Sequence, residues 1–172
     1  ALMRRVLCDI INSDKRFQVV AKATNGLEAF DLLSRNTYDA VVLDVNMPKM
    51  NGIELLEELR KYKISARVVM ASTDTKEGAK VTMDALELGA LDFIHKPNSA
   101  IDCREDSFKT NLLRILAVAV DSKPPVFESR EKILAERQTV GKMVDIVKRH
   151  VTGTAGEKIV AIASSTGGPK AL

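Results

Sequence analysis

One short stretch limits what this chain can fold into more than any other: residues 40–52, AVVLDVNMPKMNG. It opens with the apolar run 40–43, which has no polar alternation and is typical of a strand buried on both faces of a parallel sheet. Asp44 ends this run. Asn51 and Gly52 then predict the start of a helix, with Asn51 as its N-cap. Ligands bind at the carboxyl ends of strands in such sheets, so we expect Asp44 to stand at a site.

Short apolar runs alternate with amphipathic stretches through the first part of the chain. The predicted strands are 17–23, 40–44, 67–71 and 91–95, and the predicted helices are 1–12, 27–33, 53–63, 76–88 and 106–120. Gly89 follows the fourth helix as its predicted C-terminal stop. Alternating strands and helices predict an α/β fold with a doubly wound parallel sheet.

The chain divides at Pro124 and Pro125. Charged, weakly amphipathic patterns beyond these prolines predict a partly helical interdomain linker. A new apolar run, 158–163, predicts another buried strand after a break that is rich in Gly and Thr. We therefore expect three parts: a first domain over 1–121, a linker over 122–156, and the start of a second α/β domain over 157–172.

Composition and charge exclude several classes of function. The net charge of +3 and the isoelectric point of 8.9 are too weak to indicate a nucleic-acid partner without a clustered basic patch. No apolar run is long enough to cross a membrane, and no signal peptide is visible. Cys8 and Cys103 lack a Cys or His at metal-ligand spacing, which indicates free thiols in a reducing compartment. We expect a cytoplasmic protein without membrane insertion.

Polar side chains follow three of the predicted strands: Asp44, Ser72 and Lys96. A carboxylate can attack a phosphoryl group and carry it as an acyl phosphate, and a hydroxyl and an ammonium can neutralise its charge. The backbone carbonyl of Asn46 can ligate Mg²⁺. Taken singly, Ser72 is more typical of a helix-start residue and Lys96 of a solvated lysine. Their order at successive strand ends favours a phosphoryl-transfer site.

The pattern Asp-x-x-Met-Pro-x-Met-x-Gly over 44–52 resembles the phosphoacceptor loop of two-component receiver domains. The resemblance implies a flavodoxin-like fold with strand order 2-1-3-4-5. It makes Asp44 the residue that a histidine kinase phosphorylates, Ser72 the switch hydroxyl and Lys96 the counter-ion of the phosphate. It also implies Mg²⁺ as cofactor, with Asp44 and Asn46 as ligands.

The same resemblance carries two finer expectations. Phe93 is expected to be the aromatic switch position, and the Lys96–Pro97 peptide bond is expected to be cis. From the residues alone, Phe93 fits a plain core aromatic equally well, and a cis bond before proline is the minority isomer.

One feature departs from the receiver pattern. Receivers carry an adjacent acidic pair at the end of their first strand, and this pair holds Mg²⁺ together with the phosphoacceptor. This sequence starts with Ala-Leu-Met-Arg-Arg, which belongs to the first helix. We therefore expect a receiver fold with its first strand missing and with an incomplete Mg²⁺ site, and we interpret the sequence as a fragment of a longer product.

The end of the sequence holds a second group of candidate residues. A buried strand that runs into serines and then Gly167-Gly168 at a helix start suits a nucleophilic serine, because glycines permit close approach and a helix N-terminus can steady an oxyanion. A phosphate-binding turn and a plain surface loop are alternatives. Residues 162–169, IASSTGGP, resemble the start of the catalytic domain of chemotaxis protein-glutamate methylesterases, the CheB family.

This second resemblance implies a response regulator of chemotaxis. It makes Ser165 the catalytic nucleophile of a hydrolase acting on glutamate methyl esters of methylated chemoreceptors, with glutamine deamidation as a further reaction. The kinase partner is then a chemotaxis histidine kinase. The family's His and Asp are expected beyond Leu172, since His95 and His150 belong to the receiver and the linker. The chain alone is expected to lack esterase activity. The alternative is a non-enzymatic receiver module that binds partners when phosphorylated.

Overall fold

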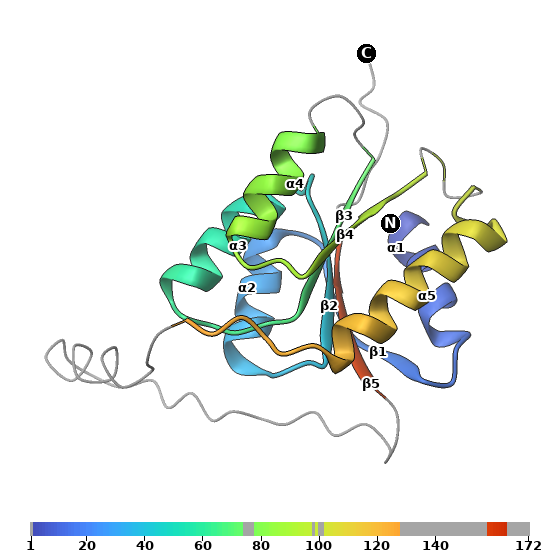
Figure 1. Ribbon diagram of the computed structural model, residues 1–172, viewed down its shortest axis with the longest axis horizontal. Helices are drawn as coiled ribbons and strands as arrows, with labels where there is room; N and C mark the ends of the chain where they lie inside the picture. Colours follow the sequence, from blue (N-terminus) through green and yellow to red (C-terminus); the bar gives the residue numbers. More distant parts are fainter. Residues whose placement is uncertain (1, 74–77, 98, 100–101, 128–157, 165–172) are drawn as a thin grey trace, which may run out of the picture.

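The computed structural model describes residues 2–73, 78–97, 99, 102–127 and 158–164. In these ranges, five parallel strands form one sheet in the order β1-β5-β2-β3-β4 (Figure 1). The strands are β1 (Phe17–Ala23), β2 (Ala40–Asp44), β3 (Val68–Ser72), β4 (Asp92–His95) and β5 (Lys158–Ala163). The helices are α1 (Leu2–Asn12), α2 (Gly26–Arg35), α3 (Gly52–Lys61), α4 (Gly78–Glu87), the short 3₁₀ helix η1 (Asp102–Arg104) and α5 (Asp106–Asp121).

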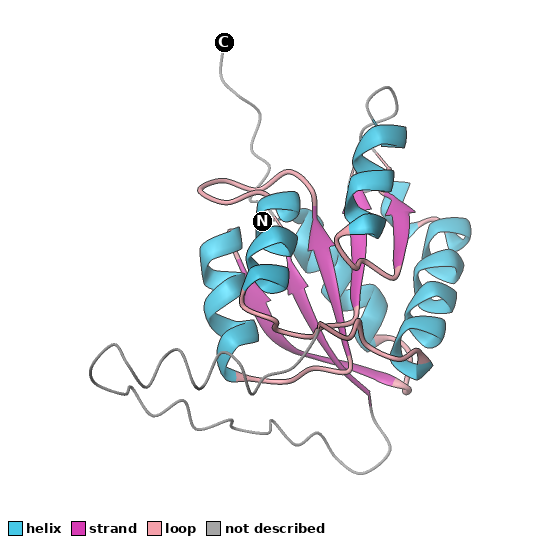
Figure 2. Cartoon of the chain, turned by 60° about the vertical axis from the view of Figure 1, so that its left-hand side comes forward, coloured by secondary structure: helices cyan, strands magenta, loops and turns pink. Residues whose placement is uncertain are grey.

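Helices cover both faces of the sheet, as Figure 2 shows. α1 and α5 pack on one face, and α2, α3 and α4 pack on the other. Successive strand residues point to opposite faces, so Val42 of β2 contacts the α1–α5 side while Leu43 contacts the opposite cluster. The predicted doubly wound α/β fold is confirmed. Among the described helices, none has both the length and the apolar character needed to cross a membrane.

β5 occupies the centre of the sheet. It pairs in parallel with β1 on one side and with β2 on the other, and Val160 lies opposite both Val19 and Ala40. Val160 and Ile162 are buried on the α1–α5 face, and Ala161 is buried on the other. The order of the sheet is the one that the receiver resemblance implies, with β5 in the place of strand 1.

This arrangement differs from the expectation that 158–163 opens a second α/β domain and that the first sheet lacks a strand. The physical reason lies in the pattern itself. An apolar run without alternation needs burial on both faces, and the gap between β1 and β2 offers that burial. Without a strand there, both would present long apolar edges. The predicted bounds of the first domain, 1–121, and of the linker, 122–156, remain predictions.

The loop after β2 is held close to the end of that strand. The Gly52 N–H donates to the Val45 carbonyl at 2.9 Å, and a Cβ on Gly52 would collide with the carbonyl oxygen of Asp44. The Asn51 side chain accepts from the Glu54 N–H, while the Glu54 carboxylate accepts from the Asn51 N–H. This capping box confirms the predicted N-cap and starts α3 directly beside Asp44.

Candidate functional site

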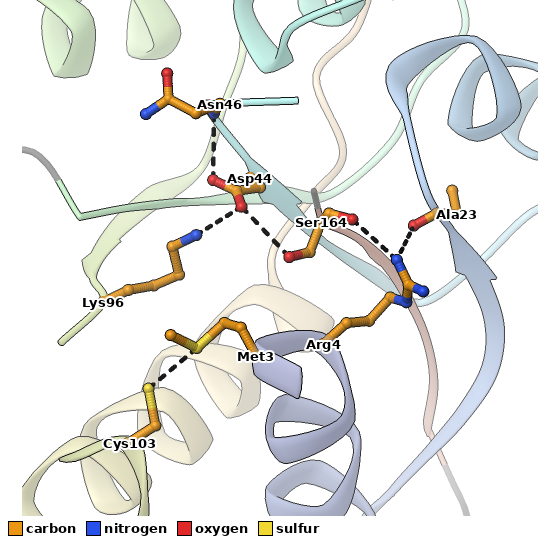
Figure 3. Close-up of polar contacts among 8 residues, drawn as sticks. All are labelled: Met3, Arg4, Ala23, Asp44, Asn46, Lys96, Cys103 and Ser164. Carbon is orange, nitrogen blue, oxygen red and sulfur yellow. Dashed lines mark hydrogen bonds and ion pairs between the residues drawn. The ribbon is translucent and has the colours of Figure 1, made fainter. Parts of the chain in front are cut away.

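A buried ion pair lies at the carboxyl rim of the sheet. Lys96 Nζ donates to Asp44 Oδ2 at 2.6 Å, and the two side chains are only 6% and 5% exposed (Figure 3). Asp44 ends β2, and Lys96 directly follows β4, where its N–H donates to the Ser72 carbonyl at 2.7 Å. The parallel strands thus bring together residues that are far apart in sequence. Because both side chains are shielded from water, each charge is stabilised by the other, and removing one would leave an uncompensated buried charge, which is costly.

Two further groups contact the Asp44 carboxylate. The backbone N–H of Asn46 donates to Oδ1 at 3.2 Å, and the hydroxyl of Ser164 donates to Oδ2 at 3.3 Å. Ser164 directly follows β5 and is 2% exposed. Ser164 is a site residue that sequence reasoning missed. Like Ser72 and Lys96, it is a polar residue directly after a buried strand, but the sequence does not show which strands lie beside β5.

Ser72 ends β3, the strand beside β2, and is buried. Its preceding residue, Ala71, is the register partner of Asp44. The structure therefore places Ser72 at the same rim as the ion pair. Its role as a switch hydroxyl remains a prediction.

Phe93 and Asn46 lie near the site in different surroundings. Phe93 sits in β4 opposite Met70 and packs, half-buried, against the core on the α2–α4 face. Asn46 is exposed in the loop after β2. The position of Phe93 is compatible with a core aromatic and equally with the predicted switch, which remains a prediction.

A divalent cation finds few ligands here. Within the part of the chain that the structure describes, no three His, Cys, Asp or Glu side chains gather into a metal site. At the candidate site, the Asp44 carboxylate already accepts from an ammonium and a hydroxyl. Mg²⁺ requires several oxygen ligands. Asp44 and the Asn46 carbonyl alone do not complete such a site, so the residues described do not fit the ion.

The expected cis bond between Lys96 and Pro97 is wrong. Every peptide bond among the described residues is trans. The trans isomer is the more stable one before proline by ~0.5–1 kcal/mol, and Lys96 reaches Asp44 with the bond in that form.

Ser165, the predicted nucleophile, lies outside the described residues, and so does His150. His95 ends β4 and is exposed, opposite Ser72 in the strand register. Cys8 and Cys103 are free and buried, and burial raises the pKa of both thiols. The predicted free thiols are confirmed.

Helix α1 fastens the rim from the side of β1. Arg4 Nη1 donates to the carbonyl of Ser164 at 3.1 Å and to that of Ala23 at 3.5 Å (Figure 3). The Ser164 N–H also donates to the Ala23 carbonyl, at 3.4 Å. The ends of β1 and β5 are thereby joined to each other and to α1, beside Asp44.

Comparison with known proteins gives concordant matches. The model of the response regulator receiver domain matches residues 1–106. The protein-glutamate methylesterase/protein-glutamine glutaminase of Pyrococcus abyssi is 39% identical over 172 residues, which are 100% of this chain and 45% of the relative. The enzyme of the same name from Thermotoga maritima is 38% identical and is matched over 46% of its length. The chain thus spans about half the length of the curated relatives it matches.

Solved structures give the same picture. The response regulator domain of Thermotoga maritima CheB has a TM-score of 0.61 and 38% identity, with 72% of this chain and 92% of that domain covered. The receiver domain of the sensor histidine kinase PA1611 from Pseudomonas aeruginosa, solved with a magnesium ion in its active-site cleft, has a TM-score of 0.55 and 21% identity over 69% of this chain and 88% of that domain. The second match concerns the fold alone.

Proposed function

Because this chain belongs to the response regulator receiver family, we propose that Asp44 is its phosphoacceptor, and that phosphorylation of Asp44 controls a protein-glutamate methylesterase of chemotaxis. The observation that carries the first part is the buried Asp44–Lys96 pair at the carboxyl rim of the sheet. A carboxylate there is a nucleophile, and a buried ammonium beside it offsets the charge of an incoming phosphoryl group.

The chemistry follows from the groups around Asp44. An oxygen of the carboxylate attacks phosphorus, and the donor leaves with the electron pair of its bond to phosphorus. The new group brings a further negative charge to a place that is already dry, so Lys96 and the Ser72 hydroxyl are drawn towards it. This inward movement is the switch that we propose. Mg²⁺ adds charge neutralisation in such transfers, but the described residues do not complete its site.

The enzymatic part of the proposal rests on the length of the likeness. The match to protein-glutamate methylesterases runs over the whole chain, beyond the receiver and through residues 158–172. We propose Ser165 as the nucleophile, methylated chemoreceptors as substrates, a chemotaxis histidine kinase as phosphodonor, and the cytoplasm as the place of action. Glutamine deamidation is a second candidate reaction of the same serine.

One observation favours a second candidate, a non-enzymatic receiver module. Residues 158–163, for which the sequence predicts the start of a catalytic domain, pair with β1 and β2 inside the first sheet in the structure. Because this strand fills a place in the receiver sheet, its presence does not require a catalytic domain. Under this candidate, phosphorylation of Asp44 changes partner binding and no ester is hydrolysed.

The first test is covalent labelling of Asp44. The natural protein that carries this chain is incubated with acetyl phosphate, and the gain of one phosphoryl group is followed by intact mass. The wild-type protein and the control Asp31→Asn, which changes an exposed aspartate of α2, should be labelled, and Asp44→Asn should not. Reduction of the acyl phosphate with borohydride should convert residue 44 to homoserine. A label that persists in Asp44→Asn would rule out the phosphoacceptor.

A second measurement separates the two candidates. The natural protein that carries this chain is mixed with methylated chemoreceptors, and release of methanol is measured with and without acetyl phosphate. The enzyme predicts release that rises with phosphorylation and disappears in Ser165→Ala. Absence of methanol from a protein that is labelled on Asp44 would favour the binding module.

A further inference from the structure

The segment that follows α5 is held against the domain. α5 ends at Asp121, and Ser122 is already extended, with φ −75° and ψ 155°. In Figure 1 the segment, in orange, runs from the end of α5 across to the side of α3. We propose that residues 122–127 form a strap bound to the receiver, and that the end of this strap, not the end of α5, is the point from which the linker leaves. Its binding requires no phosphorylation of Asp44.

Two side chains between α3 and β3 hold the strap by its carbonyl groups. Arg67 Nε donates to the Ser122 carbonyl at 2.6 Å, and Ser65 Oγ donates to the Pro125 carbonyl at 2.8 Å. Pro124 and Pro125 have no backbone N–H, so a segment of this composition is most readily held through its carbonyl oxygens. The two prolines also restrict the unbound segment, so less conformational entropy is lost when it binds.

Gly89 forms the apolar half of the binding site. It follows α4 with a φ of +105°, a conformation that favours glycine. A Cβ on Gly89 would lie 3.3 Å from Pro125 Cβ and 3.4 Å from Phe127 Cζ, so both rings pack directly on the glycine backbone. Lys123 and Val126 are exposed, Val126 at 89%. The strap therefore has one bound side and one solvent side.

The binding site for the strap is itself fixed by the sheet. Arg67 directly precedes β3, and its carbonyl accepts from the Val41 N–H at 2.8 Å. The Ala90 N–H, just after Gly89, donates to the Ala85 carbonyl at 2.9 Å and closes the turn between α4 and β4. Backbone hydrogen bonds thus hold both halves of the site without help from the strap.

The position of the strap decides where the linker starts. Arg67 and Gly89 lie near the amino ends of β3 and β4, whereas Asp44 lies at the carboxyl end of β2, and these strands are parallel. Whatever follows residue 127 is therefore tethered beside α4, at the edge of the sheet opposite the candidate site. The predicted linker, 122–156, loses its first residues, 122–127, to the receiver.

The test is cleavage after Phe127 by chymotrypsin in the natural protein that carries this chain. Chymotrypsin takes the aromatic ring into an apolar pocket, so cleavage requires the ring to leave Gly89. At low protease the rate follows the released fraction of the strap. Mass spectrometry identifies the product that ends at Phe127, and a synthetic peptide of residues 122–131 gives the rate for an unbound segment. The wild type should be cut about tenfold more slowly than the peptide, since two hydrogen bonds hold the strap.

Removing either anchor should release the strap more often. Ser65→Ala and Arg67→Met each lose one hydrogen bond and should raise the rate of cleavage after Phe127 about two- to tenfold, and the double variant should be cut faster than either. Ser34→Ala and Arg35→Met, which remove a hydroxyl and a guanidinium from α2, are the matched controls and should be cut like the wild type.

A second cleavage site in the same digest reports unfolding of the domain. Phe108 is buried in α5, so the rate of cleavage after it should stay the same in every variant. If the wild type is cut after Phe127 as fast as the peptide, residues 122–127 are not bound and the strap is wrong. Anchor variants that are cut like the controls, or that are cut faster after both phenylalanines together, would contradict it as well.

Discussion

At the scale of single residues, the costliest charges of the described part of the chain are those of one buried ion pair, Asp44 with Lys96. Asp44 and Lys96 are both removed from water, and each makes the presence of the other tolerable. The other ion pairs of the described residues, for example Lys61 with Glu58, lie at the surface, where solvent and salt weaken them. A costly arrangement that surface pairs do not share is what a reactive carboxylate requires.

Removing the ammonium should destabilise the protein. Lys96→Ala leaves Asp44 buried without its counter-charge, so the free energy of unfolding should fall by ~3–5 kcal/mol, measured with urea at neutral pH. Lys61→Ala, which breaks an exposed pair, is the control and should leave the unfolding midpoint nearly unchanged. The double variant Asp44→Asn/Lys96→Met should recover much of the loss, because no charge then remains buried. Equal midpoints for Lys96→Ala and wild type would contradict the burial of the pair.

At the scale of elements, the starts of α2 and α3 fix the loop that follows Asp44. The Gly26 N–H donates to the Met50 carbonyl at 3.2 Å, and a Cβ on Gly26 would collide with Met50. Gly52 approaches Asp44 equally closely from the other side. The starts of α2 and α3 thus both contact the loop that follows Asp44.

The start of α2 also gives a pH dependence. The Thr24 N–H and hydroxyl donate to Glu28 Oε2, and the backbone bond chiefly holds the pKa of Glu28 below its usual range. This stabilisation is complete above the unfolded pKa of about 4.3 and is lost as the pH falls through the lower folded pKa. On acidification below about pH 4.3, the pKa of an unfolded glutamate, the Tm of Glu28→Gln should therefore fall less than the Tm of the wild type. Glu57→Gln on the exposed side of α3 is the control, and identical slopes for wild type and Glu28→Gln would refute the effect.

The elements before residue 122 were largely predictable. The periodicity of the sequence located four strands and five helices, and Asn51 and Gly89 marked a helix start and a helix end correctly, Gly89 with a φ of +105°. The Asp44–Lys96 pair followed from the rule that strand ends meet. Ser164 was missed, because an apolar run specifies two buried faces and does not say which sheet supplies them. The trans Lys96–Pro97 bond was missed because a family expectation replaced the ordinary isomer preference.

At the scale of the whole molecule, the sheet is continuous only because β5 fills its centre. β1 alone lies on one side of β5, and β2, β3 and β4 lie on the other side. Both core clusters include residues of β5: Val160 and Ile162 belong to one, and Ala161 and Ala163 belong to the other, so both layers of the fold depend on the same strand. A destabilising substitution in this strand should therefore weaken the packing on both faces of the sheet.

A truncation in β5 should test that dependence. Ile162 is 1% exposed, so Ile162→Ala should lower the free energy of unfolding of the whole sheet by ~2–5 kcal/mol, followed by far-ultraviolet circular dichroism in denaturant. Val118→Ala on the exposed side of α5 is the control and should change it little. If residues 158–163 belonged to a separate domain, Ile162→Ala would leave the unfolding of the receiver unaltered.

The position of β5 between β1 and β2 also has a consequence for co-translational folding. Synthesis runs from the N-terminus, so β1, β2, β3 and β4 emerge before β5, the strand that lies between β1 and β2. Pairings between such distant segments make folding slow, and until they form, the facing edges of β1 and β2 are unpaired and exposed to solvent. A nascent chain halted before residue 158 therefore lacks β5, and the five-stranded sheet forms only after residues 158–163 have left the ribosome.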